Sequence, residues 1–89
     1  MNQADKNTLN FCVEFIKGNF SEHSQVSMCL VWLKQAIDII EKETDLSSGA
    51  FILGGLKEIE AYLTGKDGSS SSRDIISKIE MIESLVASI

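Results

Sequence analysis

The side chains that could carry out catalysis are few, and their spacing does not suit it. His23 is the only histidine, and it lies between Glu22 and Ser24 near the start of a predicted helix. Cys12 and Cys29 lack the CxxC spacing of zinc and redox sites, and there is no second histidine to pair with either thiol. We therefore expect no catalytic residue, no metal site and no cofactor, and we predict that the protein is not an enzyme.

The acidic side chains are numerous, but none forms a recognisable acid–base pair. Glu58 and Glu60 are two residues apart and diverge on a helix, whereas Glu80 and Glu83 are three apart and lie together. Without an ExxH pattern, the second pair indicates a solvated helix face. The segment GKDGSSSS at 65–72 lacks the GxxxxGK[ST] order of a phosphate-binding loop, so we predict a flexible connection and no small-molecule substrate site.

Length and composition place limits on the class of protein. The 89 residues predict one domain, 1–89, and the 44% hydrophobic and 24% charged fractions are ordinary for a globular protein. The formal net charge is −5 and no segment is basic, which argues against nucleic acid and anionic membrane as partners. Apolar runs such as CLVWL are too short to span a membrane, and the N-terminal MNQADKNTLN has no signal-peptide pattern. We expect a cytoplasmic protein with buried, reduced cysteines.

Hydrophobic spacing predicts four amphipathic helices and no strand. Steps of three and four residues run through each segment, as in Ile75, Ile79, Ile82 and Val86 of the last one. The predicted helices span about 5–17, 22–42, 48–64 and 73–88. Short links between amphipathic helices favour an all-α fold, a small antiparallel bundle of about four helices, and we expect dimerisation to complete it.

The residues between these segments suit helix ends. Ser21 or Ser24 can cap the second helix, because a serine oxygen accepts a hydrogen bond from an unpaired first-turn N–H group. Ser71 or Ser72 can cap the fourth in the same way. Gly65 is placed to end the third helix as its C′ residue.

Gly54 and Gly55 lie in the middle of the third predicted helix. Each costs about 1 kcal/mol there relative to alanine. Ala50, Gly54 and Ala61 fall on one side of this helix, so we expect another helix to approach it closely.

The first two helices carry more apolar surface than one stripe requires. Met28, Trp32 and Ile39 lie beside the main stripe of the second helix and widen its apolar arc to roughly 200°. Phe11 and Phe15 lie off the stripe of the first helix in the same direction. Either the second helix is central and touches neighbours on both sides, or these five residues form an interface with a protein partner or, as a homodimer, with a second copy.

An acidic patch is predicted at the end of the second helix. Glu41, Glu43 and Asp45 lie where the helix dipole disfavours negative charge, and we expect them to steer basic partners. Together these features predict a small acidic regulatory or adaptor protein that acts through protein–protein contacts, a class that includes secretion-chaperone-like and inhibitor-like roles. The alternative is a helical DNA-associated transcriptional regulator. A third hypothesis is an enzyme or ligand carrier with a cavity between helices.

Overall fold

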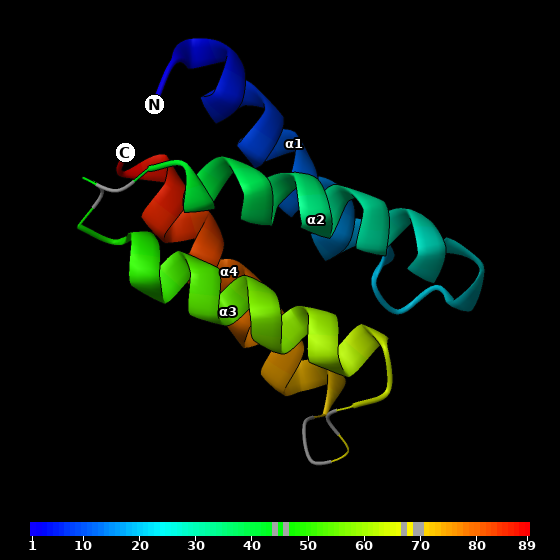
Figure 1. Cartoon of the computed structure of the whole chain (residues 1–89). Coiled ribbons are helices and arrows are strands. Elements are labelled where there is room, and N and C mark those ends of the chain that lie inside the picture. Colours follow the sequence, from blue (N-terminus) through cyan, green and yellow to red (C-terminus); the bar gives the residue numbers. More distant parts are fainter. Residues whose placement is uncertain (44, 46, 67, 69–70) are drawn as a thin grey trace.

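The computed structural model describes residues 1–43, 45, 47–66, 68 and 71–89 and shows the predicted all-α bundle (Figure 1). Its helices lie close to the predicted bounds except at the start of the second, where Glu22 precedes a short 3-10 turn. Part of the predicted flexible connection, at positions 67, 69 and 70, lies outside the described residues. The elements are α1 (Gln3–Asn19), η1 (His23–Gln25), α2 (Val26–Glu41), α3 (Gly49–Leu63) and α4 (Ser72–Ala87).

The four helices pack as a closed ring in which each helix has two neighbours. Helix α1 packs against α2 and α4, and α3 packs against the same two helices from the other side. Consecutive helices run in opposite directions, and both ends of the chain lie at the same end of the bundle (Figure 1). The ring therefore surrounds one core and leaves each helix with an outer face.

The apolar stripes predicted from the sequence meet inside this ring. Each helix contributes residues spaced three or four apart, because that spacing keeps side chains on one helix face. The buried hydrophobic residues are Leu9, Cys12, Val13, Ile16, Phe20, Cys29, Leu33, Ala36, Ile37, Ile39, Ile40, Ile52, Leu56, Ile59, Ile75, Ile79, Ile82 and Val86. One chain thus encloses a hydrophobic core of its own, without a contribution from a second copy.

Two of the predicted helix ends are confirmed, and one is wrong. Ser71 caps α4, because its side chain accepts from the backbone N–H of Asp74 while the Asp74 carboxylate accepts from the Ser71 N–H. Gly65 has φ +78° and donates its N–H to the Tyr62 carbonyl, while Lys66 donates to Ala61, which is a Schellman motif. Helix α2 has no side-chain cap, since η1 leads directly into it.

The close approach predicted at the α3 glycines occurs at Gly55 and not at Gly54. A Cβ atom built on Gly55 would lie 2.8 Å from Cδ1 of Ile82 in α4, whereas one built on Gly54 meets nothing within 4 Å. Gly55 is buried and Gly54 is exposed. The missing side chain of Gly55 therefore lets α3 and α4 pack closely, and Gly54 makes no such contact.

These two glycines form a matched pair for a stability measurement. We expect Gly54→Ala to stabilise the protein by about 0.5–1 kcal/mol, because alanine is the better helix former and has free space there. Gly55→Ala gains the same propensity but must displace Ile82 in the core, and overpacking costs about 1–3 kcal/mol, so we expect net destabilisation. Urea unfolding of both variants measures the difference, and equal stabilisation by both would contradict the packing at Gly55.

Candidate protein-contact surface

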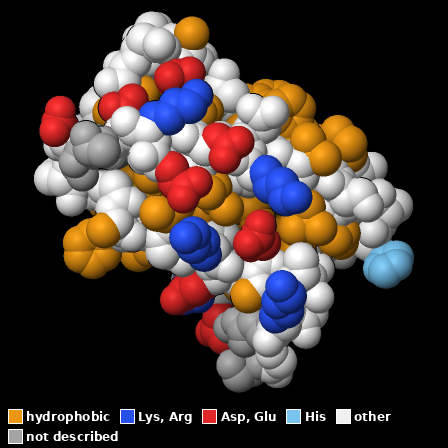
Figure 2. Space-filling model, viewed as in Figure 1, with side chains coloured by type: hydrophobic (Ala, Val, Ile, Leu, Met, Phe, Trp, Pro, Cys, Tyr) orange, Lys and Arg blue, Asp and Glu red, His pale blue; other side chains and the backbone are white. Residues whose placement is uncertain are grey.

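An aromatic patch lies on the outer side of the pair formed by α1 and α2. Its most exposed member, Phe11, is 51% exposed, Met28 and Val31 are also exposed, and Phe15 and Trp32 are half-buried. Hydrophobic side chains gather over these two helices at the upper right of Figure 2. We call Phe11, Phe15, Met28, Val31 and Trp32 the aromatic patch.

Three rings hold the patch together. The ring centroids of Phe11 and Trp32 are 4.9 Å apart with an interplanar angle of 75°, which is an edge-to-face contact. Phe15 lies 6.1 Å from Phe11 and 6.3 Å from Trp32, measured between centroids. The rings thus pack on one another across the helix pair, which orders them before any partner arrives.

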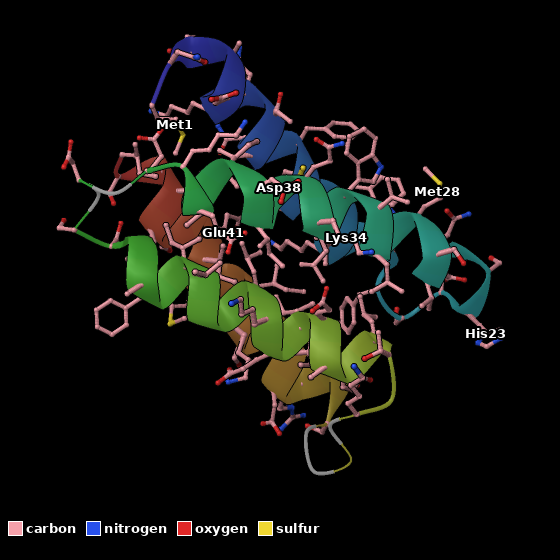
Figure 3. All side chains as sticks on the ribbon, in the orientation of Figure 1. Met1, His23, Met28, Lys34, Asp38 and Glu41 are labelled. Atoms are coloured by element: carbon pink, nitrogen blue, oxygen red, sulfur yellow. The ribbon has the colours of Figure 1, made fainter. Side chains whose placement is uncertain are left out.

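Helical spacing explains why these residues share one surface. Phe11 and Phe15 are one turn apart on α1, and Met28 and Trp32 are one turn apart on α2. Met28 projects away from the bundle near the first turn of α2 (Figure 3). The two short stripes lie next to each other because α1 and α2 pack together in opposite directions.

Ile39 was predicted with this set, but the structure places it elsewhere. It is 5% exposed and belongs to the core, so it is not available to a partner. At that end of α2 the start of the chain lies beside the helix, with the Met1 ammonium 3.3 Å from Glu43 Oε2 (Figure 3). The outer face of α2 is therefore open near Met28 and closed near Ile39.

Val31 belongs to the patch but was not predicted from the sequence. It follows Met28 by three residues, and this spacing places it on the same side of α2, farther from the core. Val31 is a β-branched aliphatic residue within an apolar run, and its residue type therefore suggests burial. Only its angular position around the helix axis could have indicated that it lies on the surface.

The predicted acidic patch is only partly open. Glu41 and Asp45 are exposed, whereas Glu43 is half-buried and paired with the Met1 ammonium. Lys42 lies between two of these carboxylates and is exposed as well. The local negative charge is therefore smaller than three carboxylates suggest, and the steering role stays a prediction.

The two thiols are buried in the core, whereas the histidine is exposed. Cys12 and Cys29 are free thiols with no exposed surface, and burial raises the pKa of Cys12 to about 11 and raises that of Cys29. His23 is exposed at the tip of the turn before α2 (Figure 3). Within the described residues, no three histidine, cysteine or acidic side chains come close enough to hold a metal ion.

Of the predicted solvated acidic pair on α4, Glu80 is exposed, and Glu83 is partly exposed and also links two helices. Glu83 accepts from Lys17 of α1, with 3.0 Å between Oε1 and Nζ, and Glu58 of α3 pairs with Lys78. Hydrogen bonding to Glu83 and repulsion by its charge raise the pKa of Glu14, while hydrogen bonds from Glu14 and Lys17 lower the pKa of Glu83. Where α1 meets α4, the carboxylates of Glu14 and Glu83 are thus neighbours beside the ammonium group of Lys17.

The comparisons with known proteins give no relative. No family model, curated protein or solved structure matches this chain. None of the helices in the described part of the chain combines the length and apolarity that crossing a bilayer requires.

Proposed function

We propose that the protein is a small, non-enzymatic regulatory or adaptor protein that acts through protein–protein contacts, with the aromatic patch as its contact surface. The observation that carries the proposal is the exposure of packed aromatic rings on a helix pair whose core is already complete. Aromatic residues and methionine are enriched at the centres of protein interfaces, where their burial from water stabilises the complex. Secretion-chaperone-like and inhibitor-like proteins belong to this class.

Burial of the aromatic patch by a partner is energetically favourable. Burying one large apolar side chain contributes roughly 1.5–3 kcal/mol, while a domain of this size has a total stability of about 5–13 kcal/mol. Phe11 leaves half of its surface in water although the core beneath it is filled. A partner that covers the patch recovers a free energy that the isolated chain forgoes.

Site-specific photo-cross-linking in the native host tests this proposal. A benzoylphenylalanine at Met28, which is exposed in the patch, should form adducts with protein. The same residue at Phe51, which is 69% exposed on α3, is the control and should form few. Absence of a protein adduct from position 28, or equal adducts from both positions, would overturn the proposal.

The alternative, a DNA-associated regulator, makes a different prediction. A duplex-DNA complex whose affinity falls steeply with salt would favour it, because phosphate contacts release counterions. Of the two basic residues on α4, Lys78 is paired with Glu58. No observation on the described surface therefore favours this alternative over the protein-contact role.

A further inference from the structure

Uncharged side chains adjoin the aromatic patch on both helices and form what we call its uncharged surround. Helical spacing places Ala4, Asn7, Thr8 and Gly18 on the patch side of α1, and Ser27 and Gln35 one turn to either side of Val31 on α2. All six are at least partly exposed. Two copies that each carry a net charge of −5 repel each other where carboxylates meet, and these uncharged residues lower the cost of their approach at this surface.

Close to the centre of the patch, the two long edges of this surface carry side chains of opposite charge. On α1, Glu14 lies three residues after Phe11 and is exposed beside Glu83. On α2, Lys34 lies three residues after Val31 and is also exposed (Figure 3). Asp38 lies one further turn along, seven residues after Val31, and is exposed too, so the α2 edge is positive only beside the centre of the patch.

A two-fold axis parallel to the helices makes these edges complementary. That axis lays α1 of one copy across α2 of the other. In each of the two equivalent contacts, the edge with Glu14 on one copy then faces the edge with Lys34 on the other. A two-fold axis perpendicular to the helices would instead bring α1 against α1 and Glu14 against its own copy. Charge complementarity therefore selects the first arrangement.

The size of the patch sets the expected strength of the contact. Its five side chains expose on the order of 300 Å², which is the range of functional patches on monomers. A standard stable interface buries about 800 Å² per partner, more than the patch and its uncharged surround together provide. The contact should therefore be reversible, with a Kd in the range of about 10–100 µM.

We infer that the occupant of the aromatic patch is a second copy of this chain, with α1 of each protomer lying across α2 of the other. This inference rests on the proposed function, because it names the partner of the same contact surface. Each protomer would cover the exposed half of Phe11 on the other protomer. Glu14 of each protomer would then lie near Lys34 of the other.

Sedimentation equilibrium of the full chain between about 5 and 500 µM tests the inference. We expect a monomer–dimer equilibrium that Phe11→Ala weakens at least tenfold. Phe51→Ala removes an exposed ring of the same type from α3 and should leave the Kd unchanged within twofold. Thermal unfolding of both variants verifies that they remain folded. A wild-type monomer throughout this range, or equal weakening by both variants, would overturn the inference.

Charge reversal tests the arrangement of the two copies. Glu14→Lys and Lys34→Glu should each weaken the dimer severalfold at low salt, and the double variant should restore the wild-type Kd within about threefold. Failure of the double variant to restore association would exclude the arrangement of α1 across α2. A strictly monomeric protein that still forms adducts with another protein from position 28 would refute self-association but retain the proposed function.

Discussion

Ile79→Ala is expected to destabilise the protein by about 3–4 kcal/mol. Ile79 is 1% exposed in the middle of α4 and belongs to the core shared by all four helices. Truncation of a buried isoleucine removes its burial from water and leaves a cavity that the neighbours fill only partly. For a domain of this size the melting temperature should fall by roughly 15 °C or more.

Ile76→Ala is the matched control, because it makes the same chemical change one turn earlier on the same helix. Ile76 is 41% exposed, so its truncation should cost less than about 1 kcal/mol, and the higher helix propensity of alanine offsets part of that. Thermal and urea unfolding of both variants give the comparison. Similar losses of stability in the two variants would mean that α4 does not direct Ile79 into the core and Ile76 toward solvent.

The two native thiols should be almost unreactive while the protein is folded. At pH 8 we expect Cys12 and Cys29 to react with a disulfide reagent at least a hundredfold more slowly than in the unfolded chain. Both thiols are fully buried, so the reagent cannot reach them. Burial also raises both pKa values, so that only a small fraction of each thiol is the reactive thiolate. Asn10→Cys places an exposed thiol two residues before Cys12 and should react at an ordinary rate.

The raised pKa of Cys12 also predicts a dependence of stability on pH. Its folded-state pKa of about 11 lies above the ordinary value of 9.0, so the fold favours the protonated thiol. This contribution is fully present below pH 9 and is lost as pH rises toward and through 11. The urea midpoint should therefore fall more steeply between pH 9 and 11 for the wild type than for Cys12→Ala, and parallel curves would contradict the assignment.

The architecture could be predicted because hydrophobic spacing is a local property. The steps of three and four residues through Ile75, Ile79 and Ile82 require one buried helix face, whatever the neighbouring helices do. The ends at Ser71 and Gly65 could be predicted for the same reason, since a capping side chain and a left-handed glycine act within a few residues. The order of the helices around the ring was not predicted, because it depends on contacts between distant segments.

The contact surface was only partly predictable, since exposure depends on what lies opposite each residue. Angular position alone grouped Ile39 with Trp32, although the start of the chain lies beside one end of α2 and not the other. The same limit applies to Gly54 and Gly55, which have equal propensity, because only the position of Ile82 distinguishes them. Sequence spacing thus identifies an apolar face, and the packing of other segments decides which part of it remains open.

Because the four helices form a closed ring, we expect the fold to tolerate a different starting point of the chain within that ring. The Lys6 ammonium of α1 donates to the carbonyl oxygen of Ile89 over 2.9 Å. The beginning and the end of the chain are therefore direct neighbours at the end of the bundle that holds both termini (Figure 1). A circular permutant that links residue 89 to residue 1 and opens the turn after Ser21 would retain every pair of packed helices. Deleting α1, in contrast, would uncover α2 and α4 at once, so shortening the chain should be far more damaging than reconnecting it.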